Sequence, residues 1–314
     1  MPTIREMPYV IKAVWFGSVG PLEVVVRRGN VVEGRHRVHA VAWHDGRIVE
    51  QAGDPRLVSF LRSSSKPILA LPLVRARDDL DSRDVAIACA SHRAEPAQLE
   101  AVRRLLAKAP ARERELECGI QEGRPREPLH HNCSGKHAGM LALCRARGWR
   151  SEGYRHAAHR VQRAGAQAHA EAAGVDEDSM ATGVDGCGIV TFALPLERAA
   201  EAFARLGALS GASRIVEAMT AHPDLVGGVG QADTDLMRAL PGWIAKGGAD
   251  GLGCAAGPDG LGVALKVEDG SHRPMRPALH AFFGRIGLEL PDEFARVPVL
   301  NAHGEDVGEV VSGL

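Results

Sequence analysis

Short valine-rich hydrophobic runs alternate with turn residues in the first third of the chain, and this pattern predicts β-strands. Strands are expected at Leu22 to Val26 and at Val38 to Trp43. A third strand, Arg47 to Gln51, follows a His44-Asp45-Gly46 turn, so it is expected to pair with the second as a hairpin. The apolar run Val85 to Ala90 is also expected to form a short strand.

Helical spacing dominates the middle of the chain. Leu99, Val102, Leu105 and Leu106 recur at intervals of three and four residues, which predicts an amphipathic helix. Further helices are expected over Met140 to Cys144, His156 to Ala173 and Ser213 to Ala221.

Strand-like segments return near the end, at Leu261 to Val267, and Pro277 to Ile286 is expected to be helical. Strands at both chain ends around a helical middle predict an α+β fold in which the two ends share one antiparallel sheet. The sequence contains no internal repeat and no low-complexity linker. We therefore expect a single domain over residues 1–314, with sheet regions near 20–95 and 240–314 and a helical region near 96–239.

Composition narrows the classes of function. The formal net charge of −1 gives no electrostatic reason to expect nucleic acid or an anionic membrane as a partner. The longest apolar runs, such as Pro67 to Val74, are far shorter than the ~20 residues needed to span a bilayer. Met1 to Trp15 carries mixed charges that are not typical of a secretory signal. Six cysteines without such a signal favour reduced thiols, so we expect a cytoplasmic protein.

Lysine is scarce, since only six of the 38 basic side chains are lysine. Three of the six, Lys66, Lys136 and Lys246, lie in short segments of Ser, Cys and Gly. Arginine stays charged in a protein, whereas a lysine amine can become neutral and act as a base or a ligand. We infer that arginine cannot replace these three lysines and that they belong to a nucleophilic site.

The first of these segments places Ser63 three residues before Lys66. If a helix begins here, the two side chains share one face, and the amine can take the proton of the hydroxyl. This role requires a neutral lysine, and hence burial or nearby positive charge to lower its pKa. Pro67 fits only in the first turn of such a helix. The alternative is a polar turn with a solvated lysine.

A second lysine segment, Lys246-Gly247-Gly248, follows an apolar run and is expected to close a strand. Its glycines would let a substrate approach the backbone closely. Serine acyl-transfer enzymes of the β-lactamase type combine Ser-x-x-Lys with a later lysine followed by Ser or Thr and then Gly. Gly247 stands where the hydroxyl residue would be. Ser91, between the two lysine motifs, is the candidate for a second serine that relays protons; the alternatives are an ordinary loop and a serine at the end of a strand.

Two more segments place Cys133, with Lys136 close by, and Cys187 in glycine-flanked turns. Two thiols, an amine or imidazole and a water would complete a tetrahedral zinc site, although the spacing is not that of a Cys-x-x-Cys pair. Asp185 is a candidate for binding a substrate ammonium, or for bonding its own turn. The other cysteines are expected to be inert buried thiols.

These segments together resemble the Rhizobium-type L-asparaginases, the asparaginase II family. The resemblance spans roughly Val32 to Asp269 and implies a serine β-lactamase/glutaminase-like fold, usually as a homodimer. It is carried by Arg62-Ser-Ser-Ser-Lys-Pro67, Cys89-Ala-Ser-His92, Asn132-Cys-Ser-Gly-Lys-His-Ala-Gly139, Asp185-Gly-Cys187 and Ala245-Lys-Gly-Gly-Ala-Asp250, in that order.

The resemblance also implies roles for individual residues. Two Ser-Lys tandems fall on Ser63 with Lys66 and on Ser91 with Lys246. Zinc would be bound beside the site, and further residues would contact the substrate. The implied zinc ligands are Cys133, Lys136 and Cys187, and the expected substrate contacts are Arg62, His92, Asp185 and Gly247. The Lys-Gly-Gly segment departs from the Lys-Leu-Gly of the family, which bears on the shape of the pocket.

We therefore expect an amidohydrolase that converts L-asparagine to L-aspartate and ammonia through a serine acyl-enzyme. A glutaminase or another serine acyl-transferase of the same fold is the first alternative. Asparagine and glutamine differ by one methylene, a discrimination of about 1–3 kcal/mol that motifs do not resolve. A non-catalytic sensor of zinc or another ligand is the second alternative, and two intact Ser-Lys pairs argue against it. Neither nucleic acid nor a membrane is expected as a partner.

Overall fold

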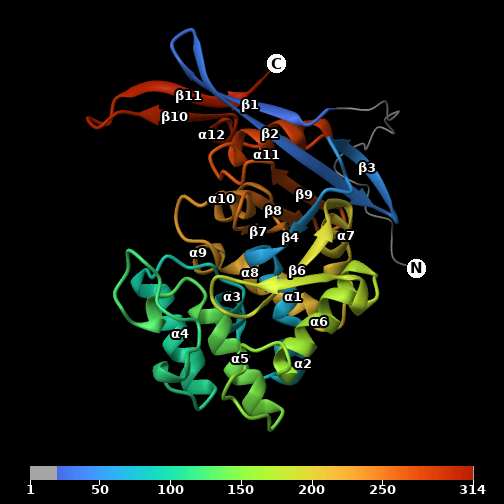
Figure 1. Cartoon of the computed structure of the whole chain (residues 1–314), viewed down its shortest axis with the longest axis vertical. Coiled ribbons are helices and arrows are strands. Elements are labelled where there is room, and N and C mark those ends of the chain that lie inside the picture. Colours follow the sequence, from blue (N-terminus) through green and yellow to red (C-terminus); the bar gives the residue numbers. More distant parts are fainter. Residues whose placement is uncertain (1–19, 314) are drawn as a thin grey trace.

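Both ends of the chain contribute strands to one large antiparallel sheet, as the sequence predicts. The computed structural model describes residues 20–313. The strand order is β10-β11-β1-β2-β9-β8-β7, and β3 also pairs with β2. The strands are β1 (Leu22–Arg28), β2 (Val31–His44), β3 (Arg47–Ala52), β7 (Ile244–Gly248), β8 (Leu252–Ala256), β9 (Gly262–Val267), β10 (Arg296–Leu300) and β11 (Asp306–Ser312). Figure 1 shows this sheet in the upper part of the molecule, with α2, α4 and α5 at the opposite end.

The long strand β2 changes environment along its length. Its first half alternates exposed and half-buried residues, whereas Val38 to Ala42 are all buried. Helix α7 (Leu196–Leu206) packs on this second half of β2 and on the neighbouring strands β8 and β9. Helix α11 (Met275–Arg285) packs on β1, β10 and β11. The expected hairpin is confirmed, because Val41 pairs with Gln51 and the turn at Asp45 and Gly46 has positive φ angles of 48° and 77°.

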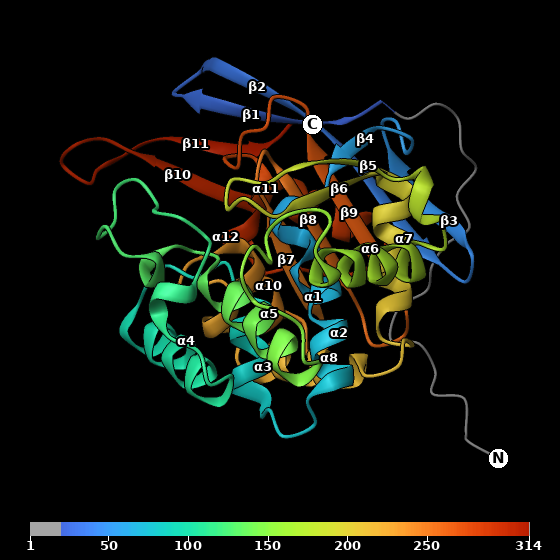
Figure 2. The same ribbon diagram turned by 60° about the horizontal axis from the view of Figure 1, so that its bottom comes forward.

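The middle of the chain is mainly helical but also contains a small sheet that the sequence did not predict. Its order is β4-β6-β5, with β4 (Val58–Phe60), β5 (Ala181–Val184) and β6 (Val190–Pro195). The remaining helices are η1 (Arg62–Ser65), α1 (Lys66–Leu69), α2 (Leu71–Ala76), α3 (Ser82–Ala88), α4 (Pro96–Lys108), η2 (Glu113–Glu115), η3 (Pro128–His130), α5 (Ser134–Ala146), α6 (Arg160–Ala173), η4 (Glu177–Ser179), α8 (Ala212–Ala221), α9 (Pro223–Val226), α10 (Ala232–Ala239) and α12 (Asp292–Ala295). Figure 2 shows α5 and α6 in front of the body that the strands form.

Helix α5 begins earlier than its apolar pattern suggests. It starts at Ser134 rather than near Met140, so Cys133 is its N-cap residue and Lys136 lies in its first turn. The predicted helices of the 99–106, 156–173 and 213–221 regions correspond to α4, α6 and α8. The strand predicted at Leu261 to Val267 and the helix predicted at Pro277 to Ile286 correspond to β9 and α11.

The strand prediction for Val85 to Ala90 is wrong, because most of this run belongs to helix α3. The Asp81 side chain accepts hydrogen bonds from the Arg83 and Asp84 backbone amides at 3.1 and 3.2 Å, and the Asp84 side chain accepts from the Asp81 amide at 3.0 Å. This capping box defines a helix start. A short, fully buried apolar run fits a strand or a helix equally well by periodicity.

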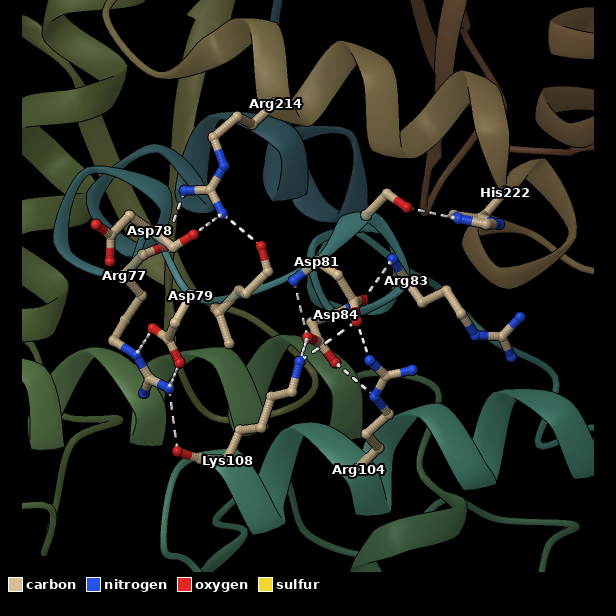
Figure 3. Close-up of polar contacts among 12 residues, drawn as sticks. Arg77, Asp78, Asp79, Asp81, Arg83, Asp84, Arg104, Lys108, Arg214 and His222 are labelled. Atoms are coloured by element: carbon tan, nitrogen blue, oxygen red, sulfur yellow. Dashed lines mark hydrogen bonds and ion pairs between the residues drawn. The ribbon is translucent and has the colours of Figure 1, made fainter.

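Charged side chains from α4 hold the start of α3 in place, as Figure 3 shows. Lys108 bonds to both Asp81 and Asp84, and Arg104 pairs with Asp81. Nearby, the Arg214 guanidinium donates to backbone carbonyls of the loop before α3, including that of Leu80 at 2.6 Å. The other end of α3 leads through Cys89 and Ala90 to Ser91, so this helix connects the capped start to that serine.

Candidate active site

A cavity of about 650 Å³ brings together chemistry from distant parts of the chain. Ser63 reaches it from η1, Ser91 from the segment after α3, and Lys246 from strand β7. These are three of the four residues that the sequence predicts to be catalytic. The fourth, Lys66, lies directly behind Ser91.

Lys66 is fully buried, with an exposed fraction of 0%. Its Nζ lies 2.8 Å from Ser91 Oγ and 2.6 Å from the Ala90 carbonyl oxygen. Burial is the main cause that lowers the pKa of this amine, and the positive charges of Lys136 and Lys246 act in the same direction. Against the opposing effect of the Cys133 thiolate, the pKa falls to about 8. The neutral amine is therefore accessible near neutral pH, as a general base requires.

The helix that carries Lys66 begins as expected. The chain runs from η1 into α1 without a break, and Lys66 keeps helical angles (φ −60°, ψ −39°) although Pro67 follows it. Pro67 occupies the first turn of α1, where its missing N–H costs no hydrogen bond.

The two Ser-Lys tandems that the resemblance implies stay a prediction. Lys66 contacts Ser91, and within residues 20–313 no hydrogen bond joins Ser63 to Lys66 or Ser91 to Lys246. The Ser63 hydroxyl lines the cavity without a hydrogen-bond partner in this part of the chain. Of the two serine hydroxyls, that of Ser91 is the one in contact with Lys66.

Lys246 is instead bound to Asp233, a residue that the sequence analysis missed. Its Nζ lies 2.8 Å from Asp233 Oδ2 and 3.1 Å from the Gly247 carbonyl oxygen. The same carboxylate oxygen accepts from the Gly247 amide at 3.1 Å. Burial by itself would raise the pKa of Asp233, but Lys246 more than offsets this and holds the pKa below its usual value. No motif surrounds Asp233, so only the fold identifies it.

Two glycines follow Lys246, and they differ in their surroundings. A Cβ added to Gly248 would lie 2.7 Å from the Leu61 carbonyl oxygen and 2.8 Å from Ser64 Oγ, so the close approach of β7 to η1 requires glycine. A Cβ on Gly247 would meet only Asp233 Oδ2 at 3.7 Å, an ordinary contact distance. A side chain would fit at position 247, and glycine there widens the cavity that it lines.

The residue before Ser63 has a strained backbone. Arg62 adopts a positive φ of 50°, which non-glycine residues rarely do. Its amide donates to Thr191 Oγ1 at 3.3 Å, and its guanidinium pairs with Asp185 at 2.7 Å and also with Asp250. Asp185 is thus engaged by a side chain, and its expected contact with the substrate stays a prediction, as does that of Arg62.

His92 is buried, and both of its ring nitrogens are engaged. Nε2 lies 2.7 Å from Ser134 Oγ, and Nδ1 accepts from the Ala94 amide at 3.1 Å. Burial lowers the pKa of His92 to about 3, so the imidazole is neutral. These contacts tie the Ser91-His92 segment to the start of α5, and the role of His92 in substrate binding stays a prediction.

The expected zinc ligands lie together beside Lys66. Lys136 Nζ lies 3.0 Å from Cys187 Sγ, and Asp185 Oδ2 lies 3.6 Å from the same sulfur. A hydrogen bond from the Cys187 thiol and the charge of Lys136 hold the pKa of Cys133 well below its usual value despite burial, and the pKa of Cys187 is raised. Burial lowers the pKa of Lys136, but the two cysteines and Asp185 reverse this and raise it.

These donors fit a metal in type and position. Two thiols and an amine converge, but the amine is held protonated and would have to release its proton to become a ligand. Residues 20–313 contain no cluster of three or more His, Cys, Asp and Glu side chains arranged around a metal position. Any metal here therefore depends on the lysine.

The other four cysteines match the expectation of inert thiols. They are free and buried, and burial raises the pKa of each. These residues are Cys89, Cys118, Cys144 and Cys254. In residues 20–313 no helix is both long and apolar enough to cross a bilayer.

A family model described as L-asparaginase II matches residues 24–312, which is nearly the whole chain. No curated protein sequence matches.

Proposed function

The chain belongs to the L-asparaginase II family, and we propose that it hydrolyses the side-chain amide of L-asparagine to L-aspartate and ammonia. The observation that carries this proposal is the 2.8 Å contact between the buried Lys66 amine and Ser91, next to a cavity that Ser63 also lines. A neutral amine against a hydroxyl is the arrangement that serine acyl transfer requires.

Ser63 is the nucleophile in this scheme, because it opens the Ser-x-x-Lys motif and its hydroxyl faces the cavity free of other bonds among the described residues. Neutral Lys66 takes the Ser63 proton as the serine oxygen bonds to the side-chain carbonyl carbon of asparagine. A catalytic contact such as that between Ser63 and Lys66 is often long in the substrate-free enzyme and shortens when substrate binds. Ser91, which contacts Lys66, passes the proton to the amide nitrogen. Ammonia leaves as the C–N bond breaks, and an aspartyl ester remains on Ser63.

Water completes the reaction. It attacks the ester carbonyl and gives its proton to Lys66, and the proton then returns to the Ser63 oxygen as aspartate leaves. The Lys246–Asp233 ion pair stays intact on the cavity wall throughout. Its lysine lowers the pKa of Lys66, so the second lysine motif supports the base rather than acting as one.

We further propose that Cys133, Lys136 and Cys187 hold a zinc ion. Zinc there would supply charge and rigidity rather than an activated water, because the adjacent carboxylate, Asp185, is bound to Arg62. It would fix Asp185 and, through Arg62, the strained turn before Ser63. The family resemblance also favours a β-lactamase/glutaminase-like fold and a homodimer.

The decisive experiment measures turnover of L-asparagine, L-glutamine and a β-lactam side by side, with Ser63→Ala as the inactive control. We expect ammonia release from asparagine, less from glutamine, and no β-lactam hydrolysis. Preference for glutamine would assign a glutaminase, and turnover of the β-lactam alone would assign another acyl-transferase of the same type. Binding of asparagine without ammonia release would identify a sensor.

A further inference from the structure

The cavity carries more positive charge than the proposed chemistry uses. Two of its cations are neutralised, since Lys246 pairs with Asp233 and Arg276 pairs with Asp235. Three other arginines line the same cavity, and no ion pair to any of them occurs within residues 20–313. These are Arg93, Arg124 and Arg273. An anionic ligand would balance this charge.

Arg124 is held against the segment that follows Ser91. Its Nη1 donates to the His92 carbonyl oxygen at 3.2 Å and to the His130 carbonyl oxygen at 2.9 Å. His92 is the residue after Ser91, so these bonds fix the guanidinium one residue from the proton relay. They use only one of its nitrogens, and the remaining N–H donors are left for a ligand.

The Cys133 thiolate compensates the positive charge of Arg124 only in part, because the net pKa of the guanidinium is lowered. Burial lowers the pKa of this guanidinium, and the charge of neighbouring Arg93 lowers it further. Gln121 lines the cavity beside it and accepts a hydrogen bond from the Asn132 amide at 2.8 Å through its carbonyl oxygen. This leaves the NH₂ of Gln121 as another donor. Two guanidinium groups and a carboxamide thus face the cavity with donors only.

We propose that Arg124, with Arg93 beside it, binds the α-carboxylate of the substrate. A guanidinium matches a carboxylate through paired N–H···O bonds, and such bonds strengthen when water is excluded. The site would therefore select amides that carry a carboxylate and discriminate against neutral amides of similar size. This inference rests on the proposed asparaginase function and adds the group that orients the substrate.

The test compares L-asparagine with L-asparagine amide, in which a carboxamide replaces the α-carboxylate. In Arg124→Gln we expect KM for asparagine to rise about 10- to 150-fold with kcat nearly unchanged, as for a lost charge-assisted hydrogen bond. The kinetics with asparagine amide should not change. Arg124→Lys should restore part of the affinity. An Arg124→Gln enzyme with wild-type KM for asparagine, or equal losses with both substrates, would overturn the inference.

Matched variants control for effects on the fold. Arg126 is exposed on the same loop and does not line the cavity, so Arg126→Gln should behave like wild type. Arg93 is also exposed, so Arg93→Gln should fold normally and raise KM for asparagine by a smaller factor. If Arg124→Gln does not fold, Arg93→Gln with unchanged KM overturns the proposal.

Binding measurements separate this inference from the asparaginase proposal. Calorimetry with L-aspartate, the reaction product, requires no turnover. Wild-type binding that is lost in Arg124→Gln would support the carboxylate site even in a protein that releases no ammonia. Equal binding by both proteins, or no binding by wild type, would overturn it.

Discussion

Lys246 Nζ and Asp233 Oδ2 lie 2.8 Å apart in a buried ion pair on the wall of the cavity that Ser63 and Ser91 line. The lysine side chain is 1% exposed and the aspartate side chain 11%. The side chain that Lys246 contacts is therefore a carboxylate and not a serine hydroxyl. Lys66, by contrast, contacts a serine hydroxyl, that of Ser91.

The buried pair should matter for stability. Asp233→Asn removes one partner of a desolvated ion pair, which typically costs about 3–5 kcal/mol. Asp235→Asn on the same helix is the matched control, because its pair with Arg276 is more exposed and should cost at most about 1 kcal/mol. Urea denaturation of both variants measures the difference. Equal free energies of unfolding for the two variants would show that the Lys246–Asp233 contact is not a desolvated pair.

The pH dependence of activity should report Lys66. Its neutral form is the base, so kcat/KM should rise with pH and level off above a pKa of about 8. Burial causes most of the lowering, and Lys246 contributes in the same direction. Lys246→Met removes that charge, so the pKa of Lys66 should rise and the acidic limb should move to higher pH.

Lys266→Met is the control, because it also removes one lysine charge but lies outside the cavity. The acidic limb of its pH profile should match that of wild type. If the acidic limb of the pH profile of Lys246→Met stays in place or moves to lower pH, the two lysines are not electrostatically coupled.

The cap of α3 should affect both stability and catalysis, because this helix leads into Ser91. Asp81→Ala removes a helix cap, a change that typically costs about 0.5–2 kcal/mol. It also removes a partner of Lys108 and Arg104. We expect a lower melting temperature and a lower kcat. Asp79→Ala, which breaks only an exposed pair with Arg77, should change neither by much.

Zinc binding is tested by metal analysis and by removing the metal. Wild type should bind a single zinc ion per chain, whereas Cys133→Ser and Cys187→Ser should not. Cys144→Ser, a buried cysteine elsewhere on α5, should bind zinc normally. Stripped protein should melt at lower temperature and show a raised KM with kcat largely kept. Fully retained turnover with unchanged KM would rule out any role for the metal in substrate binding.

The sequence identified candidate site residues more easily than it identified the residues they contact. Ser63, Lys66 and Lys246 were found because each lies in a short, chemically distinctive segment. Asp233 and Arg124 have no such surroundings, and only the path of the chain brings them to the cavity. The contact between Lys66 and Ser91 depends on how the chain folds between them, which spacing does not specify.

Some parts of the fold were likewise predicted from the sequence, and others were not. The antiparallel sheet shared by both chain ends followed from valine-rich strands and turn signals. The strand assignment at Val85 to Ala90 failed because the Asp81–Asp84 capping box before it was not recognised. The small sheet formed by β4, β5 and β6 was missed because its strands are only three to six residues long.

The central claim is that a neutral Lys66 amine takes the proton of the attacking serine. Ammonia release from L-asparagine by Lys66→Arg tests it most directly, because arginine keeps the charge but cannot act as a base. We predict a loss in kcat of about 10²–10⁴-fold, close to that of Lys66→Ala, in a folded protein. A Lys66→Arg enzyme with turnover near that of wild type would contradict the mechanism.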